Sequence, residues 1–243
     1  VKLPRGMTLW EAMAYGTAGY TAGLAIVKME HNGLKPANGP VVVNGATGGV
    51  GSIALAALAK LGYAVTALTG KESESDWLKK LGAKEILLRQ SLDLAKIRPL
   101  DKALWAGGVD NLGGEVLAWM ASTTKVNGVI ACIGLAASPN LAGTVLPLIL
   151  RGVSLLGVNS TDAPSPELER QVWQRLATDM RPPMLKEMAR NGSAYDLAAI
   201  FGVKDVLDPR ETRAYLAEML DIHAPRLSNG VGRHLLANWP TSY

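Results

Sequence analysis

The feature that most constrains the fold is a strand, a glycine-rich loop and a helix that follow one another directly. Residues 41–43 (VVV) form a short apolar β-branched run, and residues 44–51 read NGATGGVG. Residues 52–62 have good helix propensity and end on a glycine. Glycines let the backbone approach phosphates closely, and the free N–H groups and dipole of a helix N-terminus attract anions. The arrangement predicts a βα unit that binds a dinucleotide pyrophosphate.

The spacing within this loop is Ala46-x-Gly48-x-x-Gly51, with alanine in place of the first glycine of the usual G-x-G-x-x-G pattern. The pattern alone is a weak signal, and its position between a strand and a helix strengthens it considerably. A plain βα turn is the alternative.

Similar units recur along the chain. Apolar runs at residues 63–68, 85–88, 129–133 and 153–158 are expected strands, and residues 8–30, 69–83 and 144–150 contain helical segments. Wholly apolar strands that alternate with helices are typical of parallel sheets covered on both faces. The predicted fold class is therefore α/β, a Rossmann-like doubly wound parallel sheet with a short α/β C-terminal tail.

Composition excludes several classes of protein. With 48% hydrophobic and 19% charged residues, the 243-residue chain is not a disordered tail. One cysteine and three widely separated histidines provide neither a disulfide framework nor a metal site. A net charge of +4 suits an anionic small molecule and is weak evidence for nucleic acid, so no nucleic-acid partner is expected. Without a long apolar run or a signal peptide, we expect no membrane association and a cytoplasmic location.

The end of the second strand predicts the cofactor. An NAD site places an acid there for the ribose 2′-hydroxyl, whereas this chain has Thr69, Gly70 and Lys71. A hydroxyl, a backbone N–H and a cation suit a 2′-phosphate, and Arg89 is a second candidate cation. These residues favour NADP(H) over NAD(H). Two alternatives are that both cations are ordinary surface charges and that Glu72 turns toward the ribose.

Residues after the later strands are candidates for the nicotinamide side of the site. Leu135 and Ser160 follow expected strands, and the carboxyl ends of parallel strands line the ligand crevice. Cys132 is more typical of a buried, inert thiol than of a nucleophile. Asp110 is expected to be a turn or capping residue rather than a proton donor. No residue is predicted to be catalytic.

Several motifs give the chain a specific resemblance. Residues 3–179 resemble the nucleotide-binding half of the zinc-independent medium-chain reductases, in the subgroup of acryloyl-CoA reductases and YhdH-type quinone oxidoreductases. The motifs are AYGTAGYTA (14–22), GATGGVGS (45–52), TGKES (69–73), LWAGGVDNLGG (104–114), ACIGLA (131–136), LPLILRGVSLLGVNS (146–160) and WQRLATD (173–179).

The resemblance implies a reaction and a cofactor site. The family reduces an activated carbon–carbon double bond with NADPH, so the resemblance implies an acyl-CoA or enone substrate. A homodimer is a further expectation. The pyrophosphate residues would be Thr47, Gly48, Gly49, Val50 and Gly51. The 2′-phosphate residues would be Thr69, Gly70 and Lys71, and the site would be completed by Arg89, Leu135, Ile149 and Ser160.

The chain departs from this family at both ends. The family's N-terminal β-rich domain is missing, and the chain begins at Val1 as though trimmed, so residues 1–180 are expected to be an NADP(H)-binding Rossmann domain alone. Residues 188–243 resemble the tail of a biotin-dependent acyl-CoA carboxyltransferase subunit, most strongly in DVLDPRETR (205–213), so residues 181–243 are expected to be a carboxyltransferase-like segment. A divergent reductase end is the alternative for this tail. The functional alternatives are a non-catalytic NADP(H)-binding module and a carboxylase-related fusion segment.

Overall fold

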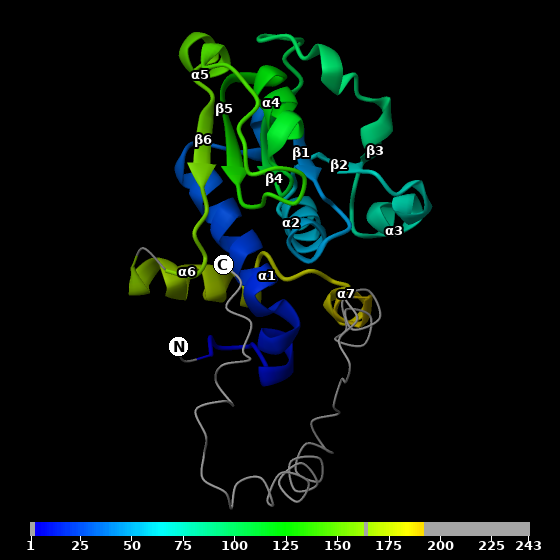
Figure 1. Ribbon diagram of the computed structural model, residues 1–243. Helices are drawn as coiled ribbons and strands as arrows, with labels where there is room; N and C mark the ends of the chain where they lie inside the picture. The colour runs from blue at the N-terminus through cyan, green and yellow to red at the C-terminus, as the bar shows by residue number, and fades with distance from the viewer. Residues whose placement is uncertain (1–2, 163–164, 192–243) are drawn as a thin grey trace, which may run out of the picture. The chain divides into compact units, whose positions relative to one another are not determined.

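A single six-stranded parallel sheet forms the centre of the computed structural model, which describes residues 3–162 and 165–191 (Figure 1). The strand order is β3-β2-β1-β4-β5-β6, and every neighbouring pair is parallel. The strands are β1 (Val41–Asn44), β2 (Val65–Thr69), β3 (Glu85–Leu88), β4 (Trp105–Asp110), β5 (Thr124–Cys132) and β6 (Ser154–Gly157). This order is that of the doubly wound Rossmann fold, so the predicted fold class is confirmed.

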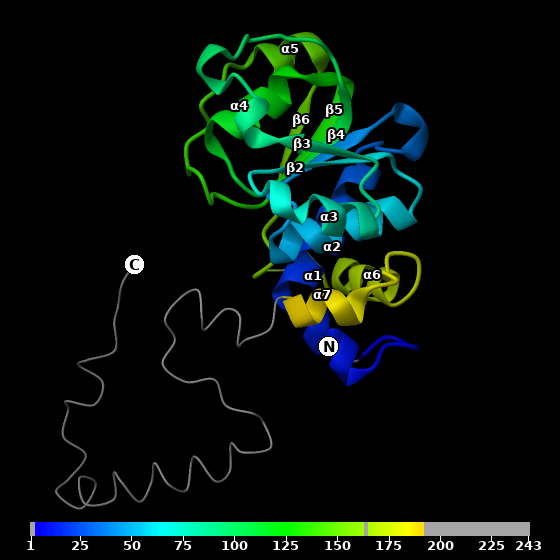
Figure 2. The ribbon, with the colours of Figure 1, turned by 90° about the vertical axis from the view of Figure 1, so that its right-hand side faces the viewer.

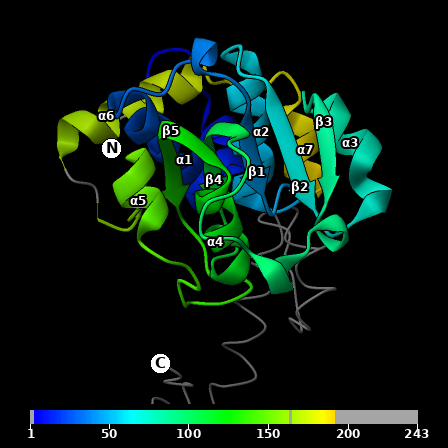
Figure 3. The same ribbon diagram turned by 90° about the horizontal axis from the view of Figure 1, so that it is seen from above.

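Helices cover both faces of the sheet (Figure 3). They are α1 (Leu9–His31), α2 (Gly49–Lys60), α3 (Ser75–Lys80), α4 (Gly114–Ser122), α5 (Leu146–Arg151), α6 (Pro166–Ala177) and α7 (Leu185–Asn191). Residues of α1, α2, α3, α6 and α7 share the larger hydrophobic core with one face of the sheet, whereas α4 packs in the smaller core on the other face. None of the helices in the described part of the chain is long and apolar enough to span a membrane.

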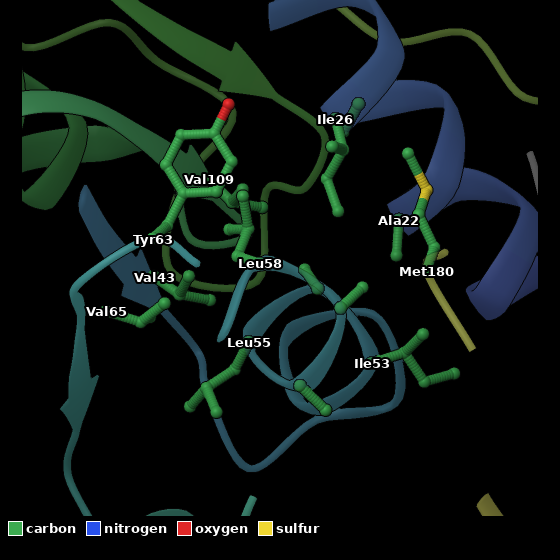
Figure 4. Packing of buried hydrophobic residues seen from close by; sticks show 14 of the residues in the cluster. Ala22, Ile26, Val43, Ile53, Leu55, Leu58, Tyr63, Val65, Val109 and Met180 are labelled. Carbon is green, nitrogen blue, oxygen red and sulfur yellow. The ribbon is translucent and has the colours of Figure 1, made fainter. Parts of the chain in front are cut away.

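The central strands are buried along their whole length. All residues of β1, β2 and β4 are buried, which matches the uninterrupted apolar run at the start of β1. The larger core lies between α1, α2 and the sheet, and it includes Ala22 and Ile26 of α1, Leu55 and Leu58 of α2 and Val43 of β1 (Figure 4). Burial of this surface is the main favourable contribution to folding.

Two helices near the C-terminal end of the described chain belong to this same core. Both α6 and α7 lie beside α1 (Figures 1 and 2), and the Tyr15 hydroxyl donates a hydrogen bond to the Leu176 carbonyl at 2.8 Å. Met180, Leu185 and Met188 are buried in the core. The compact unit therefore extends to Gly192, twelve residues beyond the expected boundary at residue 180. Most of the carboxyltransferase-like segment, residues 192–243, lies outside the described residues.

Candidate cofactor site

The glycine-rich loop makes a tight turn between β1 and α2. Gly45 has a φ of 57°, and its carbonyl accepts a hydrogen bond from the Gly48 N–H at 2.9 Å. A Cβ atom on Gly51 would lie only 2.2 Å from the Gly45 carbonyl oxygen, so this position requires glycine. Ala46, at the first position of the motif, is fully buried. The turn in this chain therefore depends on Gly45, one residue before the motif begins.

The loop leads directly into a free helix N-terminus. Helix α2 begins at Gly49, three residues before the start that propensity predicts, and Gly48 is its N-cap without a side-chain hydrogen bond. The first N–H groups of a helix, here those of Gly49, Val50 and Gly51, have no carbonyl partner within the helix. They are donors suited to an anion such as a pyrophosphate.

A cavity of about 280 Å³ lies beside this loop, at the carboxyl ends of β1, β2 and β3. Its lining residues are Gly45, Thr47, Leu68, Thr69, Gly70, Lys71, Arg89 and Leu112. The structure thus brings together five of the predicted site residues, from three separate strand ends. The sheet order makes this possible because β1, β2 and β3 are adjacent.

Two cations and no acid line this cavity. The Lys71 N–H donates to the Thr69 hydroxyl oxygen at 3.0 Å, which fixes the turn after β2. A Cβ on Gly70 would lie 3.7 Å from Arg89 Nη2, so the guanidinium is directly above this glycine. Lys71 and Arg89 are both exposed, and neither forms an ion pair within residues 3–162 and 165–191. The cavity is therefore electropositive and suited to a phosphate monoester.

A buried polar cluster lies at the carboxyl ends of the central strands β1 and β4. Asn44 and Asp110, the last residues of the two strands, are both fully buried, and the Asn44 amide donates to the Asp110 carboxylate at 2.5 Å. The carboxylate also accepts the Gly113 N–H at 3.1 Å. Burial raises the pKa of Asp110, although the bonds from Asn44, Gly113 and Leu112 oppose this shift. Asp110 is a turn and capping residue, as expected.

The predicted nicotinamide-side residues have different positions. Leu135 is exposed and lies three residues beyond β5, and Ser160 follows β6, so both lie past the carboxyl ends of their strands. Ile149 is on α5, whose last residue, Arg151, donates to the carbonyls of Ser122 and Thr124. Thr124 is the first residue of β5, so α5 lies at the amino end of the sheet (Figure 1). The structure does not bring Ile149 to the crevice.

Cys132 ends β5 next to this crevice. Burial, reinforced by the charge of Asp110, raises the pKa of its thiol to about 11. A thiol with such a pKa is almost wholly protonated at neutral pH and is a poor nucleophile. The expectation of an inert cysteine agrees with this environment.

Comparison with known proteins places this geometry in a family. The family model described as zinc-binding dehydrogenase matches residues 49–178. The chain belongs to the zinc-binding dehydrogenase family. The acrylyl-CoA reductase AcuI of Ruegeria pomeroyi is 44% identical over 200 residues, which are 82% of this chain and 60% of that protein.

Solved structures of this dehydrogenase family share the fold. The YhfP protein of Bacillus subtilis, solved with NAD bound, is 39% identical with a TM-score of 0.77, covering 85% of this chain and 64% of that one. The YhdH oxidoreductase of Salmonella enterica, in complex with NADP, is 42% identical with a TM-score of 0.76, covering 83% and 63%. The chain thus spans about 60% of the length of these relatives.

The zinc in the family's name has no counterpart in the described residues. Within residues 3–162 and 165–191 there is no group of three or more His, Cys, Asp or Glu side chains that could hold a metal ion. A catalytic zinc site needs three protein ligands of these types.

Three functional features were missed by sequence reasoning. The first is the positive φ of Gly45, and the second is the hydrogen bond from Asn44 to Asp110. The third is the hydrogen bond that the Asn111 side-chain amide donates to the Asn44 carbonyl at 2.7 Å. An Asn-Gly pair at the end of a strand is a turn signal and could have indicated Gly45. The pairing of Asn44 with Asp110 depends on which strands are neighbours, and no local signal reports that.

Proposed function

We propose that this chain binds NADP(H) and belongs to a reductase that transfers hydride from NADPH to the activated C=C bond of a short enoyl-CoA such as acryloyl-CoA. The observation that carries the proposal is the cavity where Thr69, Gly70, Lys71 and Arg89 meet without an acid. The relatives AcuI, an acrylyl-CoA reductase, and YhdH, solved with NADP, support the same reaction and cofactor.

The residues present fit the cofactor. Gly51 and Gly70 leave space that a Cβ would fill beside the loop and beneath Arg89, and the N-terminus of α2 supplies free N–H donors. In this proposal Thr47 and Gly48–Gly51 hold the pyrophosphate, and Thr69, Lys71 and Arg89 hold the 2′-phosphate. Leu135 and Ser160 flank the nicotinamide, which supplies the hydride when bound. The chain's own contribution is to bind and orient the cofactor.

A non-catalytic NADP(H)-binding module is the second candidate. It is favoured because neither titratable group near the crevice is free to react. The Asp110 carboxylate already accepts hydrogen bonds from Asn44 and Gly113, and the raised pKa of Cys132 keeps its thiol protonated. NADPH oxidation in the presence of acryloyl-CoA separates the two functions, because only the reductase consumes NADPH.

The cofactor assignment is tested by fluorescence titration of NADPH and NADH against Lys71→Glu. We expect this change to raise the Kd for NADPH about tenfold or more and the Kd for NADH by less than about threefold, since only NADPH carries the 2′-phosphate. Lys79→Glu is the matched control, because Lys79 is exposed on α3 and does not line the cavity. Equal losses for both cofactors would contradict the assignment.

We also propose that the chain forms a homodimer through the β6 edge of the sheet. The apolar side chains of Val145, Leu146, Ile149 and Leu150 are exposed on and next to α5, with 70% of Ile149 accessible. Contiguous exposed apolar surface of this kind marks an interface, and an edge strand has unpaired backbone groups that a second copy can cover.

A further inference from the structure

The buried pair Asn44–Asp110 stands at the point where the sheet's winding reverses. β1 and β4 are neighbours in space, although β2 and β3 lie between them in sequence. Their last paired residues, Val43 and Val109, are in register, and the next residue of each strand supplies the polar side chain. Ligands of doubly wound sheets bind outside the carboxyl ends of the strands at this reversal. The pair therefore lies directly behind the candidate cofactor crevice.

Hydrogen bonds from this pair reach both loops that leave the two strands. The Asn44 side-chain oxygen accepts the Asn111 N–H at 2.6 Å, while the Asn44 amide donates to Asp110. The Asp110 carboxylate accepts the N–H groups of Leu112 and Gly113 at 3.3 and 3.1 Å. The side chains of Asn44 and Asp110 thus fix the conformation of the β4 loop relative to the end of β1.

A third loop is connected to the same point. The Asp110 carbonyl accepts the N–H groups of Ile133 and Gly134, the two residues that follow β5. A Cβ on Gly134 would lie 2.3 Å from the Asn111 carbonyl oxygen, so these two loops are in close contact. Leu135, the predicted nicotinamide neighbour, follows immediately in sequence.

Two of the eight residues that line the cavity are held by this cluster, and both lie on the loops that follow β1 and β4. Gly45 follows Asn44, Leu112 is bonded to Asp110, and both line the cavity. A Cβ on Gly45 would lie 3.1 Å from the Asn111 Cβ, so the phosphate loop rests against the β4 loop. A change in the Asn44–Asp110 pair would therefore reach the phosphate loop in two ways, through the peptide bond from Asn44 to Gly45 and through the contact of Asn111 with Gly45.

A buried carboxylate is a costly way to join two strands, because an apolar pair of similar volume would avoid its desolvation. The carboxylate provides directional hydrogen bonds, because it accepts several N–H donors at once and thereby fixes the backbone that carries them. Donors that are fixed before a ligand arrives bind it more tightly, because the cost of ordering them has already been met in folding.

We infer that Asn44 and Asp110 form a positioning pair that holds the phosphate loop and the β4 loop at the spacing required by the pyrophosphate of the cofactor. This inference rests on the proposed NADP(H) function. Within the described residues, neither side chain of the pair forms a hydrogen bond with Lys71 or Arg89. The pair therefore acts on the pyrophosphate half of the site and leaves the two cations of the 2′-phosphate half unchanged.

The experiment compares two ligands on the full 243-residue chain. NADPH requires both halves of the site and is titrated by fluorescence, whereas 2′-AMP carries only the 2′-phosphate and is measured by ligand-observed NMR. We expect Asp110→Asn and Asn44→Asp each to raise the Kd of NADPH about tenfold or more and the Kd of 2′-AMP by less than about threefold. A purely structural role would instead leave the ratio of the two dissociation constants unchanged.

The exchanged double variant Asn44→Asp with Asp110→Asn is the internal control. It retains one amide and one carboxylate with the direction of their hydrogen bond reversed, so it should recover part of the NADPH affinity that each single change removes. If a single variant fails to fold in a thermal melt, Asn111→Ala, which removes only the bond to the Asn44 carbonyl, should raise the NADPH Kd about threefold.

The outcomes are distinguishable. Unchanged NADPH affinity in folded Asp110→Asn, or equal losses for NADPH and 2′-AMP, would overturn the positioning pair while the cofactor assignment stands. Absence of NADPH binding by the unaltered chain would overturn the proposed function, and this inference with it.

Discussion

Gly51 illustrates how a single residue sets the shape of the phosphate loop. The first turn of α2 approaches the Gly45 carbonyl so closely that no side-chain atom can be placed between them. The sequence motif predicts a glycine at this position for helix–strand packing, and the structure gives the physical reason. Ala46 is tolerated at the first motif position because the left-handed turn is made by Gly45 instead.

We predict that Gly51→Ala destabilises the loop by about 1–3 kcal/mol and weakens NADPH binding, because the new methyl group overlaps a backbone oxygen that cannot move independently. Urea unfolding and NADPH titration measure the two effects. Gly157→Ala is the control, since a Cβ there meets no atom within 4 Å, and its stability should change by less than about 0.5 kcal/mol. Equal stability of the two variants would contradict the close approach.

At the scale of elements, β4 is the strand that the local sequence pattern does not predict. Residues 105–110 were recognised only within a family motif and not as a strand, because Gly107 and Gly108 have low β-propensity. The structure explains both glycines. A Cβ on Gly107 would lie 2.6 Å from the Val129 carbonyl oxygen, and one on Gly108 would lie 2.6 Å from the Met120 methyl carbon. Contacts between segments distant in sequence therefore decide this strand.

The other strands were predictable from local pattern. Apolar runs indicate β1, β2, β3 and β6 to within two residues, since each is short and bounded by turn residues. β5 begins five residues earlier than its apolar run, because Thr124 pairs with Trp105 before the register shifts. The site follows the same rule: residues on one loop were predicted together, whereas the Asn44–Asp110 contact depends on strand order.

Helix α5 carries a residue that the family resemblance assigns to the wrong end of the sheet. Ile149 was assigned to the cofactor by resemblance, yet the Arg151 bonds hold this helix at the opposite end of the strands. Its exposed apolar side chains fit an interface better than a cofactor contact within the same chain.

We therefore predict that Ile149→Asp converts a dimer into a monomer, because a charge at a buried apolar contact has no partner to offset its desolvation. Sedimentation velocity across a range of concentrations measures the change. Met13→Asp is the matched control, since Met13 is even more exposed but lies near the start of α1 and not on α5 or beside it in sequence. A dimer that survives Ile149→Asp would contradict this interface.

At the scale of the whole molecule, the boundary of the Rossmann unit is set by burial rather than by family resemblance. The resemblance ends at residue 179, and the change in sequence character after it indicates a boundary near residues 180–190. Leu185 and Met188 nevertheless lie in the same core as α1, and Glu11 of α1 forms an ion pair with Arg181. These contacts assign α7 to the cofactor unit.

We predict that a chain ending at Gly192 unfolds cooperatively, whereas a chain ending at residue 180 is less stable than that chain by about 3 kcal/mol or more. The difference reflects the apolar surface of Leu185 and Met188, each worth about 1.5–3 kcal/mol when fully buried. Urea unfolding of the two truncated chains measures it. Equal stability would place the boundary at residue 180 and would show that α7 contributes nothing to the core. A loss confined to the shorter chain would identify α7 as the last element that the cofactor sheet needs.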